Sequence, residues 1–124
     1  MKIVDEYLSA VEGRDVARLL PLFADGALVH SPLYGTVPAT EFYPRLFADT
    51  RAATLTLRAT LGGPGLVAFW FDFDWTLVDG TPAPFEVVDI AELDGEGRIR
   101  ALHIIYDTVR VRPAFHAASM PPLV

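Results

Sequence analysis

Residues 66–78 decide the fold, and they read Leu-Val-Ala-Phe-Trp-Phe-Asp-Phe-Asp-Trp-Thr-Leu-Val. Strict alternation with a period of two in an aromatic-rich run is typical of a long, half-buried strand. One set of alternating side chains must point to a single face of a sheet, and that face lines either a packed core or an apolar cavity. The two alternating sets are Phe69, Phe71, Phe73 and Trp75 on one side, and Trp70, Asp72, Asp74 and Thr76 on the other.

The composition predicts one small domain with an unusually apolar interior. The chain has 124 residues without an internal repeat, of which 52% are hydrophobic, so we expect a pocket, an oligomer interface, or both. We place the domain at residues 1–112. Because cysteine is absent, disulfides and thiolate sites are excluded, which fits a reducing compartment.

Charge and hydropathy exclude several classes of partner. The net charge of −6 argues against nucleic acid, since binding a polyanion needs a basic surface. No apolar run approaches the length of a membrane span, so we expect no membrane partner. Acidic Asp5 and Glu6 come too early for a signal peptide, so we expect a cytoplasmic protein. The chain shows no Gly-rich phosphate loop and no nucleophile elbow, and we expect no cofactor.

Three helices are predicted in the first half of the chain. Apolar spacing over residues 4–11 predicts a first helix that ends near Gly13. A second helix, capped by Asp15, is expected to run past Pro21 and to close at residues 25–26. The third is expected to begin at Thr40, with Pro44 in its first turn.

Strands fill most of the remainder. A short strand is expected over 27–33, and longer strands over 54–61, 66–78, 84–93 and 98–111. Turns are expected at residues 79–80 and 94–97, where Asp and Gly cluster. The proline-containing residues 113–124 are expected to form an extended tail.

Three short phrases, in this order along the chain, carry a resemblance to a known family. They are Leu22-Phe23-Ala24-Asp25, then Gly35-Thr36 with Glu41-Phe42-Tyr43, and finally Gly97-Arg98-Ile99. Over Tyr7 to Asp107 the chain resembles the nuclear-transport-factor-2-like superfamily, in its ketosteroid isomerase and SnoaL-like polyketide cyclase branches. The resemblance implies an α+β, cystatin-like cone. In that fold three N-terminal helices pack on a curved, mostly antiparallel sheet that encloses an apolar pocket.

The same resemblance implies candidate catalytic residues. Tyr7 and Asp89 match the two groups that donate hydrogen bonds to an enolate oxygen in ketosteroid isomerases, and Tyr43 matches a supporting tyrosine. The family's general base is an aspartate directly before a proline, where this chain has Ser31 before Pro32. An unactivated serine hydroxyl cannot take a proton from carbon near neutral pH, so classical steroid isomerisation is not expected.

The chemistry of Asp89 depends on its surroundings. With a hairpin loop at residues 94–97, Asp89 shares a face with Leu102, Ile104 and Tyr106, and burial should raise its pKa. A neutral carboxyl can donate a hydrogen bond, whereas an ionised one could act as a base. A purely structural role, with the carboxyl bonded to Tyr7 or to the backbone, is the alternative.

The placement of Asp72 and Asp74 depends on one residue of register. A two-residue loop at residues 79–80 would put both on the face of Asp89, whereas a three-residue loop would put Phe71, Phe73 and Trp75 there. We favour the second register, because the first would bury two charges without partners. The two acids then share the outer face with His103. Nothing fixes three ligands at one point there, so no metal site is expected.

Among the three histidines, His30 is the candidate catalytic base. It precedes Ser31, so strand alternation sends the two side chains to opposite faces unless a bulge intervenes. His103 is expected to face outward on the same logic, and His116 lies in the predicted tail.

Two functions remain open. The first is an isomerase, cyclase or lyase acting on a small apolar molecule with a carbonyl or phenol oxygen, held by Tyr7 and Asp89. The second is a non-catalytic pocket or a dimerisation module. A homodimer through the outer sheet face is also expected, because Val88, Ile90 and Ile105 lie there. Around Asp89 and Ser31, the predicted lining consists of Phe23, Phe42, Tyr43, Phe47, Phe71, Phe73, Val87, Ile104 and Tyr106.

Overall fold

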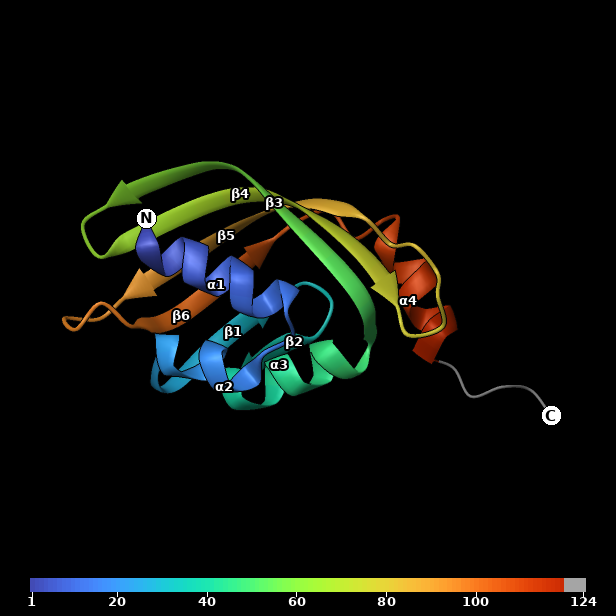
Figure 1. Cartoon of the computed structure of the whole chain (residues 1–124), viewed down its shortest axis with the longest axis horizontal. Helices are drawn as coiled ribbons and strands as arrows, with labels where there is room; N and C mark the ends of the chain where they lie inside the picture. Colours follow the sequence, from blue (N-terminus) through green and yellow to red (C-terminus); the bar gives the residue numbers. More distant parts are fainter. Residues whose placement is uncertain (120–124) are drawn as a thin grey trace.

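A curved sheet with helices on its concave side forms the body of the protein (Figure 1). The structure, a computed structural model, describes residues 1–119. The elements in chain order are α1 (Lys2–Glu12), α2 (Val16–Leu19), the 3-10 helix η1 (Leu20–Leu22), β1 (Phe23–Ser31), β2 (Gly35–Pro38), α3 (Ala39–Ala48), β3 (Thr50–Gly63), β4 (Leu66–Leu77), β5 (Phe85–Leu93), β6 (Ile99–Ile105) and α4 (Val111–Ser119).

The six strands form one sheet in the order β2-β1-β6-β5-β4-β3. Neighbouring strands are antiparallel except for β1 and β6, which run parallel. The sheet is not closed, because β2 and β3 form its two edges. This arrangement confirms the α+β cone with a mostly antiparallel sheet.

The register between β4 and β5 is the one that the sequence favoured. Phe69 lies opposite Asp89, Phe71 opposite Val87, and Phe73 opposite Phe85. The aromatic side chains of β4 are therefore buried on the concave face, and Asp72 and Asp74 lie on the outer face. This register has the lower free energy of the two, because it buries the aromatic rings and leaves the charged groups in solvent.

The second helix ends earlier than predicted. Asp15 caps α2 as expected by accepting a hydrogen bond from the backbone N–H of Arg18 at 3.1 Å. The helix tightens into η1 at Leu20–Leu22 instead of continuing to residues 25–26. From Phe23 onward the chain is extended, because Phe23 pairs with Ile99 of β6. Pairing with a strand 76 positions further along the chain overrides the local helical pattern.

The third helix begins one residue before its predicted cap. Pro38 is its N-cap, and Thr40 lies inside the first turn. Pro44 consequently falls in the second turn and not in the first. Residues 35–38, for which the sequence predicted no helix or strand, form β2 and pair with β1 from Ser31↔Gly35 to Leu28↔Pro38.

Residues 113–119 do not form the extended tail that was predicted for them. Strand β6 ends at Ile105, and residues 111–119 form α4. Pro113 is compatible with this helix because the N–H groups of a first turn have no partner within the helix. Pro121 and Pro122 lie outside the described residues. No helix within residues 1–119 is long and apolar enough to cross a membrane.

Candidate functional site

A cavity lies on the concave side of the sheet, between the sheet, α1 and α3. Its enclosed free volume is ≈ 40 Å³. Nine residues that the sequence predicted for the site line it, namely Tyr7, Ser31, Phe42, Phe71, Phe73, Val87, Asp89, Ile104 and Tyr106. Seven further residues line it as well, namely Val11, Leu33, Tyr34, Leu46, Leu55, Trp75 and Phe85.

Asp89 is the one carboxyl group in this lining. It lies on β5 between Phe69 of β4 and Ile104 of β6, and its side chain is only 1% exposed. Burial raises the pKa of Asp89 to about 8, and the nearby Tyr7 hydroxyl opposes part of that rise. The carboxyl is therefore mostly protonated at neutral pH. Among the described residues, no hydrogen-bond partner contacts its Oδ1 atom.

Tyr7 and Tyr43 form a buried pair beside Asp89. Their hydroxyl oxygens lie 2.9 Å apart and share one hydrogen bond. Burial raises the pKa of both phenols, and the neighbouring Asp89 raises them further. Both tyrosines are therefore neutral hydrogen-bonding groups and not bases at neutral pH.

Ser31 lies at the end of β1 and closes the turn that follows. Its Oγ atom accepts hydrogen bonds from the backbone N–H groups of Leu33 and Tyr34, each at 3.1 Å. A side chain that accepts two such bonds organises the loop toward β2. The hydroxyl lines the cavity but is engaged in shaping its wall.

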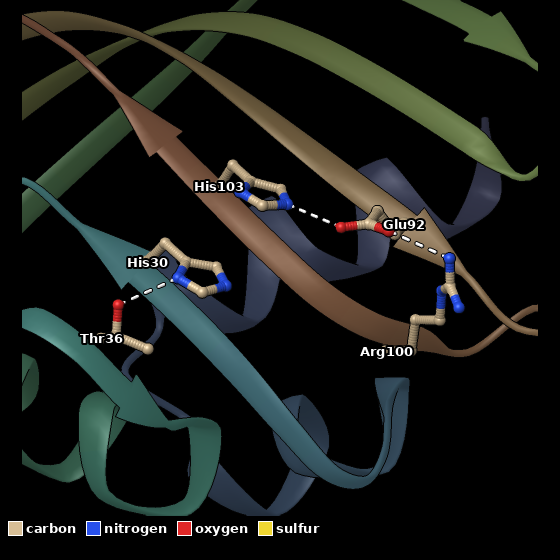
Figure 2. Close-up of polar contacts among 5 residues, drawn as sticks. All are labelled: His30, Thr36, Glu92, Arg100 and His103. Carbon is tan, nitrogen blue, oxygen red and sulfur yellow. Dashed lines mark hydrogen bonds and ion pairs between the residues drawn. The ribbon is translucent and has the colours of Figure 1, made fainter.

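His30 lies on the outer face of the sheet and not in the cavity. Figure 2 shows it beside His103, and the two rings stack with centroids 4.7 Å apart and planes 9° from parallel. The Nδ1 atom of His30 is 3.0 Å from Oγ1 of Thr36. Strand alternation between His30 and Ser31 holds without a bulge at this point, so the structure does not bring His30 together with Asp89.

His103 belongs to a charged cluster on the outer face. Its Nε2 atom lies 2.7 Å from one carboxylate oxygen of Glu92, and Arg100 donates to the other at 3.0 Å (Figure 2). These two partners hold the pKa of Glu92 below its usual range. Within residues 1–119, no group of three or more His, Asp and Glu side chains is arranged to hold a metal ion.

Three other predicted lining residues lie behind the cavity wall. Phe23 packs on Tyr43 with ring centroids 5.4 Å apart, and Phe47 packs on Tyr43 at 6.0 Å. On α3, Phe42 and Leu46 line the cavity, whereas Tyr43 and Phe47 are each one residue further around the helix. These three residues support the lining from the core.

Some of the lining residues that were not predicted follow the hydrophobic periodicity of the sequence, whereas others do not. Trp75 and Phe85 extend the alternation of β4 and β5, and Val11 and Leu46 extend helical faces, so their positions could have been inferred. Leu33 and Tyr34 lie in the short loop between β1 and β2, where no periodicity exists. Tyr34 is placed by tertiary structure, since its hydroxyl donates to Asp49 at 2.6 Å.

Comparison with known proteins gives one family match and several similar structures. The model of the SnoaL-like domain family matches residues 4–102. A hypothetical protein from Catenulispora acidiphila with a ketosteroid isomerase-like fold, solved in complex with trimethylamine, has 19% identity and a TM-score of 0.80, over 98% of each chain. TerC, co-crystallised with polyporic acid, has 17% identity and a TM-score of 0.80, over 93% of this chain and 96% of its own.

A third structure carries no assigned activity. It is an NTF2-like protein of unknown function from Exiguobacterium, with 16% identity and a TM-score of 0.73, over 85% of this chain and 98% of its own. At these sequence identities the similarity shows the fold alone. The function of the cavity depends on the side chains that line it.

Proposed function

The chain belongs to the SnoaL-like domain family of the NTF2-like superfamily, and we propose that its cavity binds a small, flat molecule whose carbonyl or phenol oxygen contacts Asp89. The observation that carries the proposal is the Oδ1 atom of Asp89, which is buried in an apolar cavity without a hydrogen-bond partner among the described residues. An unsatisfied buried polar atom costs about 1–3 kcal/mol, and a ligand oxygen at this position would remove that cost.

The protonation state of Asp89 favours an oxygen ligand. With a pKa of about 8, the carboxyl carries a proton at neutral pH and can donate it in a hydrogen bond. A carbonyl or a phenolate oxygen accepts such a bond, and an oxygen that gains negative charge accepts it more strongly. A cationic ligand fits this state poorly, because the carboxyl is uncharged.

Tyr7 is the second donor toward the same oxygen. Its hydroxyl is adjacent to Asp89 and already shares a hydrogen bond with Tyr43. When Tyr43 donates to Tyr7, the Tyr7 proton is free to point at the ligand. The three groups then form a chain in which each bond strengthens the next.

Aromatic walls select the shape of the ligand. Phe73 and Phe85 stack with ring centroids 5.1 Å apart, and Phe85 stacks on Tyr106 at 4.0 Å. Planar rings pack on such walls with little loss of conformational entropy. The enclosed free volume of ≈ 40 Å³ is below the range typical of small-molecule sites, so the side chains of the walls must move apart to admit a ring.

Binding is better supported than catalysis. An isomerase or a cyclase needs a proton acceptor in addition to the oxygen-binding donors. In the described cavity lining, Ser31 is engaged by two backbone N–H groups, and Asp89 can accept a proton only after losing the one that it donates. We therefore propose a binding pocket, and isomerase, cyclase or lyase activity is the second candidate, favoured only by the pKa of Asp89 lying near neutrality.

The experiment is a fluorescence and absorbance titration of the protein with 2-naphthol. We expect saturable binding and a shift of the bound ligand toward its phenolate. Asp89→Asn should weaken binding by about tenfold, because it replaces an O–H donor with a weaker amide donor. His30→Ala, on the outer face, is the matched control and should bind like the wild type.

Two outcomes would contradict the proposal. One is the absence of naphthol binding to the wild-type protein at millimolar concentration. The other is equal affinity for the wild type and for Asp89→Asn. If naphthol binds as expected, carbonyl compounds that enolise become the substrates to screen for the second candidate.

We also propose that a second copy of the chain packs on the outer sheet face. Val88 and Ile90 of β5 and Ile105 of β6 lie on this face, and Ile105 is 54% exposed. The three helices α1, α2 and α3 lie on the other side of the sheet (Figure 1). An apolar strip framed by charged pairs such as Glu92–Arg100 is the pattern of an interface core with a polar rim.

A further inference from the structure

Helix α4 packs against two of the residues that line the cavity. Figure 1 shows α4 beside the end of β4. Its Phe115 ring contacts two residues that line the cavity, with centroids 5.3 Å from Tyr34 and 6.0 Å from Trp75. Tyr34 comes from the loop between β1 and β2, and Trp75 comes from β4. Phe115 therefore bridges two sides of the cavity.

The paired residues of β4 and β5 define the long axis of the cavity. The innermost pair is Phe69 with Asp89, followed by Phe71 with Val87 and by Phe73 with Phe85. Trp75 is the next inward-facing residue of β4, and Phe115 packs on it. At about 3.4 Å per residue, the six steps from Phe69 to Trp75 span roughly 20 Å. Asp89 thus lies at one end of this row of residues, and Phe115 packs near the other end.

Few bonds attach α4 to the rest of the protein. Among the described residues, one side-chain hydrogen bond joins it to another element, from Nη2 of Arg112 to the carbonyl oxygen of Pro32 at 2.7 Å. Other polar contacts of Arg112 are local, to Thr108. Val111 is buried and anchors the start of the helix. A helix held by one bond and a few apolar contacts can open without global unfolding.

We propose that α4 is the gate of the cavity and that Phe115 is the specificity-determining residue that controls which molecules pass. The identity of the ligand rests on the function proposed above, whereas the gate rests on the contacts of α4. Opening requires loss of the Phe115 contacts with Tyr34 and Trp75 and loss of the Arg112–Pro32 bond. Closing places an aromatic ring across the outer end of a bound molecule and limits its length.

The first experiment needs no ligand. The chain has no cysteine, so Val87→Cys introduces a single thiol on the cavity wall at a buried position. The reaction rates of this thiol with a bulky aromatic disulfide and with small methyl methanethiosulfonate are compared. Their ratio reports the size of the opening, because global unfolding exposes the thiol to both reagents equally.

Removal of the gate should raise that ratio. Adding Phe115→Ala to the Val87→Cys protein should accelerate the bulky reagent by about tenfold relative to the small one, since two aromatic contacts are lost. Arg112→Gln, which removes the bond to Pro32 and keeps the ring, should act in the same direction and serves if Phe115→Ala folds poorly. Trp70→Ala, an aromatic deletion on the outer face, is the control and should leave the ratio unchanged.

The second experiment tests whether the gate controls the rates at which a ligand binds and dissociates. In stopped-flow binding of 2-naphthol, Phe115→Ala should raise the association and dissociation rates together and change the Kd less than either rate. A thiol ratio that is unchanged in both gate variants would overturn the gate, even if naphthol binds to Asp89. A raised ratio without naphthol binding would support the gate and contradict the proposed ligand.

Discussion

The two faces of β5 hold carboxyl groups in opposite states. On the concave face, burial raises the pKa of Asp89 to about 8. On the outer face, three residues further along, His103 and Arg100 hold the pKa of Glu92 below its usual range. The same strand thus presents a neutral donor on one side and a paired anion on the other. The face of the sheet, rather than the residue type, decides which chemistry a carboxyl can perform.

Neighbouring aromatic residues of β4 show the same contrast. Phe69 is 1% exposed and packs on Tyr7 with ring centroids 5.4 Å apart. Trp70, the next residue, is 38% exposed, donates to Glu86 at 2.6 Å, and has the Arg58 guanidinium over its ring. One ring supports the core, whereas the other covers a charged surface. Three predictions test how far this difference between the faces extends.

The largest expected effect is the pH dependence of stability that arises from Asp89. Its folded pKa of about 8 lies above the ordinary aspartate pKa of 3.8, so the folded state binds more protons than the unfolded state between these two pH values. The contribution to stability is full below about pH 4 and is lost as the pH rises to about 8. This loss should approach roughly 5 kcal/mol in the free energy of unfolding.

The measurement is urea unfolding of the wild type and of Asp89→Asn at intervals from pH 4 to pH 9. Other groups titrate in both proteins, so the difference between the two is the readout. The wild type should lose stability relative to Asp89→Asn as the pH rises, and the difference should level off above pH 8. A difference that stays constant with pH would mean that Asp89 is not a buried, unpaired carboxyl in solution.

Aromatic deletion on the two faces should differ severalfold. Phe69→Ala removes a buried ring from the core and should reduce the free energy of unfolding by about 3–5 kcal/mol. Trp70→Ala removes a half-exposed ring and should cost about 1 kcal/mol or less in the monomer. Chemical denaturation of both variants at pH 6 gives the comparison. Equal losses would contradict the assignment of the two faces.

Substitution of Ile105 should have the smallest effect on the stability of the monomer. It should nevertheless change the oligomeric state. Ile105→Asp places a charge on the exposed apolar strip of the outer face and should leave the fold and naphthol binding intact. If two copies pack through this face, light scattering at micromolar concentration should show a dimer for the wild type and a monomer for the variant. A monomeric wild type would refute the proposed dimer.

The position of Asp89 in the sheet followed from local features of the sequence. Alternation in β4 and the position of the loop between β5 and β6 were sufficient to place Asp89 opposite Ile104 and among the aromatic residues. The short connection limits the possible registers, and the cost of burying Asp72 and Asp74 decides between those that remain. Helical spacing likewise placed Tyr7 on the buried face of α1.

The packing of α4 beside the cavity was not predicted, because it depends on long-range contacts. Nothing in residues 113–119 indicates a helix, and the prolines suggested an extended chain. The helix is positioned by Phe115 against Trp75 and by Arg112 against Pro32, residues that are 40 and 80 positions away. Tyr34 is held at the cavity by the hydrogen bond that its hydroxyl donates to Asp49, at the junction between α3 and β3.

Sequence alone determined the α+β class, the two faces of the sheet and the burial of Asp89, because a period of two and a short hairpin are properties of neighbouring residues. Tertiary structure alone decided that Phe23 begins a strand, that His30 stacks on His103 outside the cavity, and that α4 packs on Trp75. These features depend on contacts between segments far apart in the chain. Local propensity has no information about such contacts, and the free energy of packing overrides it where the two disagree.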